Sequence, residues 1–181
     1  GMYLYSPAPQ VSDGAPKAQV LASGVGVRWA LDAQARLARD WGVAADVWSV
    51  TSWTELSREA QRCDAYRLLH PDSDCTPYVT SALAASSAPV IAVSDYMRAV
   101  QDQIAQYVSN DYSSLGTDGF GASDTRAALR RHFKVDAQSI VVATLRSLAR
   151  RGEVGWDVVK RALDEYRLDD VTATDVCGGV T

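Results

Sequence analysis

The apolar positions of the chain follow two periods that alternate along its length. Short, mostly apolar runs have the length of strands, and the stretches between them place apolar residues three or four apart, as the buried face of a helix does. The expected strands are Met2–Tyr5, Gln19–Ala22, Val43–Val50, Pro89–Ser94 and Tyr112–Gly116. The expected helices are Val27–Trp41, Ser52–Arg67, Pro77–Ala85, Met97–Val108, Asp124–Phe133, Val135–Arg151 and Gly155–Tyr166.

This alternation predicts an α/β fold of three layers (α/β/α), in which helices cover both faces of a mixed, mostly parallel sheet. The run Pro89–Ser94 is apolar, as expected for a central parallel strand. Proline and glycine in Ser6–Lys17 indicate a loop, and the weakly alternating strand before it fits a sheet edge. We expect an N-terminal edge strand and loop at 1–18, the α/β domain at 19–170 and a tail at 171–181.

Two helix boundaries carry local signals. The stretch Ser52–Glu55 reads SWTE, a capping box in which the serine and glutamate side chains satisfy each other's backbone N–H groups. Gly42 follows the helix Val27–Trp41, in the position where a glycine commonly ends a helix.

Composition and charge exclude some classes of protein function. The chain has 181 residues, of which 47% are hydrophobic, enough for one domain with a sizeable core. A formal net charge of −4 argues against a nucleic-acid binder, which would carry a basic stripe. No apolar run has the length of a membrane span and no secretory signal is visible. We expect a cytoplasmic protein because three cysteines without a close pair indicate reduced thiols.

The three cysteines, Cys63, Cys75 and Cys177, are an odd number without a close pair, which predicts reduced thiols. Cys63, His70 and Cys75 are close in sequence, but they lack the C-x₂₋₄-C pair and the fourth ligand of a structural zinc site. We therefore expect no metal site among them.

The densest motif is Leu115–Arg126, which reads LGTDGFGASDTR and opens a helix at Ser123 and Asp124. Its glycines favour a backbone with positive φ or a close approach to another group. The motif is either an anion- or partner-binding loop at a helix N-terminus or a tight, capped connection, and spacing alone favours the connection. Its candidate interface or anion-binding residues are Gly116, Asp118, Gly119, Phe120, Gly121 and Ser123.

A second glycine pair, Gly24 and Gly26, lies between a strand and a helix, where a dinucleotide-binding loop would lie. Trp29 stands where the third glycine of that motif belongs, so a structural turn is favoured over a small-anion pocket. Asp95 follows a buried strand at the carboxyl end, where open α/β sheets hold ligands, although such a residue more often caps the next helix.

No catalytic residue is assigned by the sequence. His132 ends a basic run at a helix C-terminus, where a cation is favourable, and His70 precedes a proline in a loop. Neither a Ser-His-Asp order nor a G-x-S-x-G elbow is present. We therefore predict no catalytic, cofactor-binding or metal-binding residue in this chain.

Several segments in collinear order resemble one family. They are LASGVGVRWAL (Leu21–Leu31), AADVWSVTSWTEL (Ala44–Leu56), His70-Pro71, PYV (Pro77–Val79), PVIAVSDYMRAV (Pro89–Val100), LGTDGFGASDTR and VDAQSIVVATLRSLARRGEV (Val135–Val154). From about Met2 to about Val171 the chain is similar to the C-terminal part of the homodimeric, bacterial-type pyruvate dehydrogenase. That family is the thiamine-diphosphate-dependent first component of the pyruvate dehydrogenase complex.

The resemblance implies a transketolase-like C-terminal domain that supports a homodimer and is inactive by itself. The full-length enzyme would use thiamine diphosphate and Mg²⁺ to decarboxylate pyruvate and would acetylate the lipoyl group of the dihydrolipoyl acyltransferase. The family's GDG motif, which holds the diphosphate through Mg²⁺, has no counterpart here, because Thr117 precedes Asp118 and Gly119. The resemblance therefore assigns the cofactor to the remainder of the full-length chain.

We expect some of the rings of Trp41, Trp48 and Trp53, and parts of the loop Thr117–Ser123, to face the remainder of the chain or the second subunit. In the isolated domain these groups would form an exposed apolar patch. Two alternatives stay open. One is a free-standing, flavodoxin-like binder of a small anion or nucleotide, and the other is a module that docks a partner subunit.

Overall fold

A five-stranded sheet forms the middle of the structure, a computed structural model that describes residues 1–173. Its strands are β1 (Met2–Ser6), β2 (Lys17–Ala22), β3 (Ala44–Val50), β4 (Val90–Val93) and β5 (Tyr112–Leu115). They lie in the order β1-β3-β2-β4-β5, with β1 antiparallel to β3 and all other neighbours parallel. The predicted mixed, mostly parallel sheet is confirmed.

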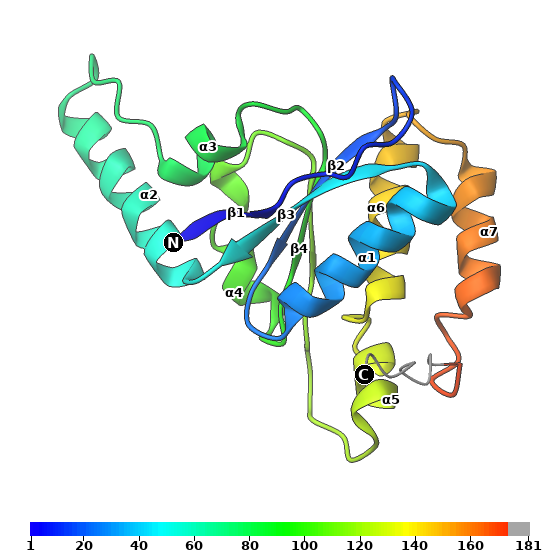
Figure 1. The fold of residues 1–181 in the computed structure, drawn as a ribbon. Coiled ribbons are helices and arrows are strands. Elements are labelled where there is room, and N and C mark those ends of the chain that lie inside the picture. The colour runs from blue at the N-terminus through cyan, green and yellow to red at the C-terminus, as the bar shows by residue number, and fades with distance from the viewer. Residues whose placement is uncertain (174–181) are drawn as a thin grey trace.

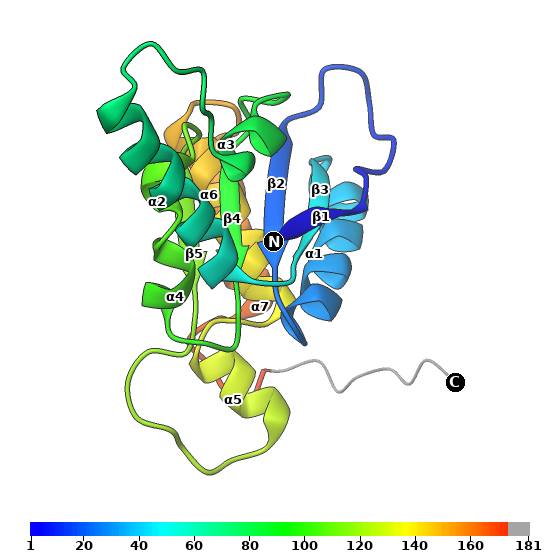
Figure 2. The same ribbon diagram turned by 90° about the vertical axis from the view of Figure 1, so that its left-hand side faces the viewer.

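Helices cover both faces of this sheet, as predicted (Figure 1). One face is covered by α1 (Gly26–Trp41), α6 (Ala137–Arg150) and α7 (Trp156–Tyr166). The other is covered by α2 (Trp53–Leu69), α3 (Tyr78–Leu83), α4 (Arg98–Asp102) and the 3-10 turn η1 (Ala105–Tyr107). The short helix α5 (Arg126–His132) lies beyond the end of the sheet where β4 finishes (Figure 2).

Successive residues of the strands contribute to two separate cores. Val20 and Ala22 of β2 belong to the core under α1 and α6, whereas Leu21 belongs to the core under α2 and α3. All four residues of β4 are fully buried, which explains its uninterrupted apolar run. Each buried aliphatic side chain stabilises the fold by about 1.5–3 kcal/mol relative to exposure.

The predicted helix Met97–Val108 is wrong as a continuous element, because the chain forms α4 and then the separate turn η1. Gln101 is buried, and its Nε2 donates to the carbonyl oxygen of Leu115 at 2.5 Å. Ile104 is also fully buried. Packing of these two side chains against the sheet outweighs the helical propensity of the segment.

The predicted capping box at Ser52–Glu55 is only half formed. The Ser52 hydroxyl accepts from the backbone N–H of Glu55 at 3.1 Å, as predicted. The Glu55 carboxylate, however, pairs with Arg58 at 2.8 Å, and the Ser52 N–H donates to the carbonyl oxygen of Gly1 at 3.1 Å. The N-terminal backbone thus satisfies the group that the glutamate was expected to satisfy.

The prediction of reduced thiols is wrong for two of the three cysteines, because Cys63 and Cys75 form a disulfide. The chain reverses direction after α2, which brings their Cα atoms to 5.6 Å, a usual distance for a disulfide. The link joins the last turns of α2 to the loop that precedes α3. Cys177 lies outside the described residues.

The end of the chain extends past the part that the structure describes. Of the predicted tail at 171–181, only residues 171–173 are described. Within residues 1–173, no helix has both the length and the apolar character needed to cross a membrane.

Candidate functional site

The loops after β2, β4 and β5 meet at one edge of the sheet, because parallel strands finish on the same side. Gly24 turns the chain with a φ of +54°, and a Cβ placed there would lie 3.9 Å from Oδ1 of Asp95. A Cβ at Gly26 would lie 3.4 Å from the carbonyl oxygen of Val93, so α1 begins in close contact with β4. Three predicted site residues therefore come together at this edge.

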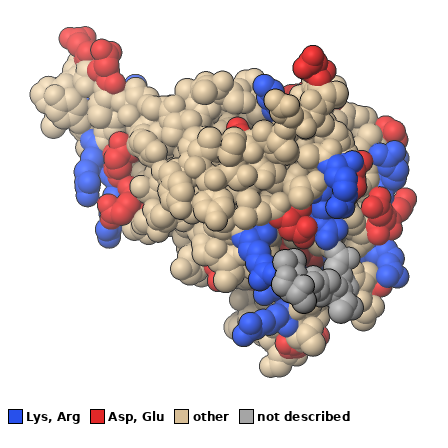
Figure 3. Space-filling model, in the orientation of Figure 1, with Lys and Arg blue, Asp and Glu red and all other residues tan. Residues whose placement is uncertain are grey.

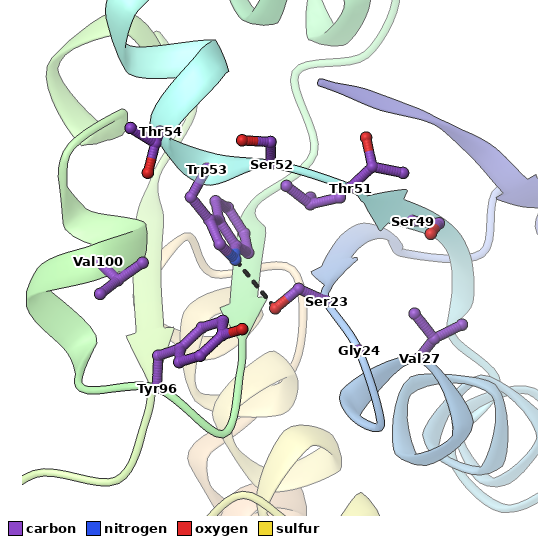
Figure 4. Close-up of a pocket in the computed structure, with 11 residues that line it drawn as sticks. Ser23, Gly24, Val27, Ser49, Thr51, Ser52, Trp53, Thr54, Tyr96 and Val100 are labelled. Atoms are coloured by element: carbon purple, nitrogen blue, oxygen red, sulfur yellow. Dashed lines mark hydrogen bonds between the residues drawn. The ribbon is translucent and has the colours of Figure 1, made fainter.

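A pocket of about 640 Å³ lies at the same edge, between the loops that follow β2, β3 and β4 (Figure 4). Its lining is hydroxyl-bearing, aromatic or aliphatic, and none of the described residues in it is charged. These residues are Ser23, Gly24, Val27, Ser49, Val50, Thr51, Ser52, Trp53, Thr54, Tyr96 and Val100. The order of the sheet reverses between β2 and β4, the position where open α/β sheets bind ligands.

A short chain of hydrogen bonds fixes one wall of this pocket. The indole N–H of Trp53 donates to the Ser23 hydroxyl at 3.0 Å, and that hydroxyl donates to Oγ of Ser94 at 3.0 Å. The backbone N–H of Tyr96 also donates to Oγ of Ser94, at 3.0 Å. A serine nucleophile needs an adjacent base, and none of the described groups in these hydrogen bonds is one.

The two histidines lie at helix ends away from this pocket. His70 ends α2, and its ring centre lies 4.3 Å from that of Tyr66. His132 is the last residue of α5, and its ring packs edge-on against Phe133 at 4.9 Å between ring centres. Neither ring lines the pocket, and both histidines are exposed.

The glycine-rich loop after β5 is bound to the loop after β4. The backbone N–H of Thr117 donates to the carbonyl oxygen of Tyr96 at 2.9 Å, and its hydroxyl donates to that of Asp95 at 2.7 Å. A Cβ at Gly116 would lie 2.6 Å from the Tyr96 oxygen and 2.8 Å from the backbone nitrogen of Arg98. The predicted close approach at this glycine is confirmed.

The favoured interpretation of Asp95 as a helix cap is wrong, because α4 begins after Met97 and has no side-chain cap from Asp95. Asp118 lies at this helix start instead. Its Oδ1 accepts from the backbone N–H of Arg98 at 2.9 Å, and its other oxygen pairs with the Arg98 guanidinium. The backbone N–H, followed by the guanidinium, holds the pKa of Asp118 below its usual value.

The tip of the same loop is exposed. The side chain of Phe120 is 97% exposed, and no atom lies within 4 Å of a Cβ placed at Gly119 or Gly121. Ser123 is exposed as well and does not begin the helix. Instead the Thr125 hydroxyl caps α5 by accepting from the backbone N–H of Ala128 at 3.2 Å, which corrects the predicted start at Ser123 and Asp124.

The tryptophans of the central segment are less exposed than predicted. Trp53 is buried within the core under α2, and Trp48 packs partly buried against that core. The indole N–H of Trp41 donates to the hydroxyl of Tyr166 at 2.9 Å, which ties α1 to α7. The ring of Trp53 lies mostly inside this domain, with one side at the pocket.

Further exposed apolar side chains lie in the loops where the strands end, and of these the sequence analysis identified only Phe120. We name Val25, Tyr96, Met97 and Phe120 the apolar edge; each side chain is more than half exposed. They come from the loops after β2, β4 and β5, which the contacts described above hold together. No periodic signal identifies Val25, Tyr96 and Met97, because single apolar residues in loops are common on protein surfaces.

Arg131 is a second residue whose role the sequence did not indicate. It is fully buried, and its Nε donates to the Asp136 carboxylate at 2.5 Å. Its Nη1 group donates to the carbonyl oxygen of Tyr166 at 2.8 Å, at the end of α7. In the sequence it lies within a basic run that is typical of an exposed helix end.

Comparisons with known proteins agree on one family. Over residues 1–136 the chain matches the family described as Transketolase-like TK C-terminal domain. The pyruvate dehydrogenase E1 component of Mycolicibacterium smegmatis is 57% identical over 177 residues, which cover 97% of this chain and 19% of that protein. The corresponding protein of Mycobacterium tuberculosis is 52% identical over 174 residues, which cover 96% of this chain and 18% of that protein.

Among solved structures, transketolase from Leishmania mexicana matches with a TM-score of 0.50 and 22% sequence identity. The match covers 86% of this chain and 19% of that chain, and it supports the fold alone. The chain thus spans about a fifth of the length of the curated relatives it matches.

Proposed function

Because the chain belongs to the family of transketolase-like C-terminal domains, we propose that it is the C-terminal domain of a pyruvate dehydrogenase E1 component. The observation that carries this proposal is 57% identity to such a protein over almost the whole chain. The full-length enzyme would decarboxylate pyruvate and acetylate the lipoyl group of a dihydrolipoyl acyltransferase. In that enzyme the domain would be a scaffold without catalytic groups of its own.

The proposed enzyme uses thiamine diphosphate with Mg²⁺, and the residues of this chain do not fit that pair. Among the described His, Cys, Asp and Glu side chains, no three lie close enough together to hold a metal ion. Asp118, the acid of the Thr-Asp-Gly sequence, is paired with Arg98. The cofactor therefore belongs, in this proposal, to the remainder of the full-length chain.

The proposed scaffold role rests on exposed apolar groups in two regions. The apolar edge is one of them, with Phe120 at the tip of an exposed loop. The other is β1, an edge strand on which Tyr3, Leu4 and Tyr5 are each about half exposed. Few charged side chains lie over the middle of the face that carries β1 and β3 (Figure 3). Contact surfaces are depleted of charge at their centres, so both regions suit contacts with the remainder of the chain and with a second subunit.

The flavodoxin-like alternative has weaker support. Its strongest feature is the pocket at the reversal point of the sheet, but none of the described lining residues offers a positive side chain to a phosphate. The carboxylate of Asp95 lies beside Gly24, where it would repel an anion. The anion-binding interpretation of the loop at Gly116–Ser123 is disfavoured for a similar reason, because Asp118 already occupies the start of α4.

A truncation series tests the proposal. The full-length protein, a version that ends just before Gly1 and the 181-residue chain are compared for pyruvate-dependent reduction of an artificial electron acceptor and for oligomeric state. We expect an active dimer from the full-length protein, loss of activity and weaker dimerisation without the domain, and no turnover by the 181-residue chain.

A full-length Arg58→Ala variant is the control, because Arg58 forms an exposed pair with Glu55 on α2. It should keep full activity. Pyruvate turnover by the 181-residue chain, or an active dimer that lacks the domain, would contradict the proposal.

A further inference from the structure

The first residue of the chain is held against one wall of the pocket. The carbonyl oxygen of Gly1 accepts from the backbone N–H groups of Thr51 at 2.8 Å and Ser52 at 3.1 Å, and from the Thr51 hydroxyl at 3.1 Å. Met2 is buried in the core under α2. Because β1 runs antiparallel to β3, Gly1 lies where β3 ends, beside the start of α2 (Figure 1).

Thr51 and Ser52 also line the pocket. Consecutive Cα atoms are 3.8 Å apart, so the residues just before Gly1 in a longer protein lie within a few residue lengths of the pocket mouth. The curated relatives are about five times as long as this chain, and the matching family is a C-terminal domain. Under the proposed function, the additional chain therefore precedes Gly1. A segment that enters the domain at Gly1 therefore reaches it beside two residues of the pocket lining, Thr51 and Ser52.

The chemistry of the pocket suits an uncharged stretch of polypeptide. The rings of Trp53 and Tyr96 and the side chain of Val100 offer apolar surface, and the hydroxyls around them can pair with peptide groups. Ser52 satisfies the N–H groups of Glu55 and Leu56. The N–H groups of Trp53 and Thr54 have no acceptor among the described residues, as is usual in the first turn of a helix.

We propose that this pocket holds the segment that immediately precedes Gly1 in the longer protein. The segment would place an uncharged apolar side chain beside Trp53 and Tyr96 and offer a backbone carbonyl to the first turn of α2. Covalent attachment gives such a segment a millimolar effective concentration, so modest contacts suffice to seat it. The occupied pocket would fix the direction from which the rest of the enzyme joins this domain.

This inference rests on the proposed function in one respect, because it requires a chain that continues before Gly1. Two other occupants are considered as outcomes of the test. A small molecule would use the same pocket from solution, and a second subunit would approach it through the apolar edge.

Site-specific photocrosslinking in the full-length protein distinguishes these occupants. Benzoylphenylalanine replaces Tyr96 in one variant and Thr54 in another; both side chains line the pocket and are exposed. A third variant carries it at Trp156, an exposed position on α7, as the matched control. Crosslinked peptides are identified by mass spectrometry, and denaturing gels separate links within one chain from links between subunits.

We expect both pocket variants to link within one chain to peptides from the twenty or so residues before Gly1, with a yield several-fold above that of the control. Links that reach only a second subunit, only a small molecule, or no such peptide overturn the proposal. The measurement does not depend on turnover. An active enzyme without the link overturns this inference alone, whereas a gene product with no chain before Gly1 overturns the proposed function as well.

Discussion

Two glycines of one loop, Gly116 and Gly121, have opposite surroundings. A Cβ at Gly116 would lie 2.6 Å from the carbonyl oxygen of Tyr96, whereas nothing lies within 4 Å of a Cβ at Gly121. We expect Gly116→Ala to lower the free energy of unfolding by about 1–3 kcal/mol, because backbone atoms must move to admit the methyl group. Gly121→Ala should be neutral or stabilising by up to about 1 kcal/mol.

Urea denaturation of the two variants beside the parent protein measures this difference. Equal stabilities for Gly116→Ala and Gly121→Ala would show that the loop does not approach the start of α4 as closely as the structure indicates.

Tyr112 gives the fold a sensitivity to alkaline pH. Burial, and then the nearby charge of Asp102, raises the pKa of Tyr112, and its hydroxyl donates to the carbonyl oxygen of Gln101 at 2.8 Å. Above about pH 10 the unfolded chain loses the phenolic proton while the folded chain keeps it. The stability that is present below pH 10 is therefore lost progressively as the pH rises further.

Unfolding free energies measured from pH 8 to pH 11 test this dependence. Tyr112→Phe should flatten the alkaline decline and cost about 1 kcal/mol at neutral pH through the lost hydrogen bond. The flattening should be partial, because burial also raises the pKa of Tyr107 and Tyr166. An unchanged alkaline slope in Tyr112→Phe would count against this account.

Helices α5, α6 and α7 are joined through one buried arginine. Arg131 at the end of α5 pairs with Asp136, whose other oxygen caps α6 by accepting from Ser139 N–H at 2.9 Å. The same guanidinium donates to the carbonyl oxygens of Tyr166 and Ala173. Arg131→Ala should lower the free energy of unfolding by about 3–5 kcal/mol, because it leaves a largely buried carboxylate without its partner.

Denaturant titration of Arg131→Ala and of the Arg131→Ala/Asp136→Ala pair measures the effect. The double variant should recover part of the loss, since no unpaired carboxylate remains. An Arg58→Ala control, in an exposed pair on α2, should differ from the parent by less than about 0.5 kcal/mol. A small effect of Arg131→Ala would mean that solvent reaches this pair.

The disulfide Cys63–Cys75 ties the end of α2 to the loop before α3. The two cysteines are 12 positions apart in the sequence. A disulfide that closes a loop of similar size stabilises a fold by about 3 kcal/mol. Reduction should therefore lower the unfolding temperature and release two additional thiols, counted with a thiol reagent. Cys75→Ser should abolish the difference between oxidising and reducing conditions; a difference that persists would rule out this pair as its source.

We expect the apolar edge to contribute to subunit association in the full-length protein and not to the stability of this domain by itself. Phe120 is almost fully exposed, so Phe120→Ala should leave the unfolding temperature of the 181-residue chain unchanged. In the full-length protein the same change should weaken subunit association, because a fully buried phenylalanine contributes about 1.5–3 kcal/mol. Sedimentation over a range of concentrations measures the association. Equal dimer stability with and without the ring would exclude Phe120 from the contact.

The order of strands and helices could be predicted because each period of apolar residues reflects burial on one or both faces of a single element. The run Val90–Val93 and the helix that Gly42 ends needed no information from distant residues. Predictions from local sequence failed where a residue distant in the sequence makes the hydrogen bond or packing contact that a neighbour was expected to make. Gly1 replaced Glu55 at the start of α2, and burial of Gln101 interrupted the helix after Met97.

The candidate site was predicted only in part, for the same reason. Gly24, Gly26, Asp95 and Gly116 were selected from local signals, and parallel strands that finish on one side bring them to one edge. The carboxylate that accepts from the first backbone N–H of α4 belongs to Asp118 rather than Asp95. This pairing could not be predicted, because it depends on how the loop after β5 folds back onto the loop after β4.

The sequence by itself therefore determined the elements and the class of fold, because short-range patterns encode which faces are buried. The family followed from the resemblance of collinear motifs, not from these patterns. The pocket, the apolar edge, the buried Arg131 and the Cys63–Cys75 link arise from contacts between segments that meet only after the chain has folded. Pairings of this kind depend on the direction in which each loop returns to the sheet, and spacing along the sequence carries no record of that direction.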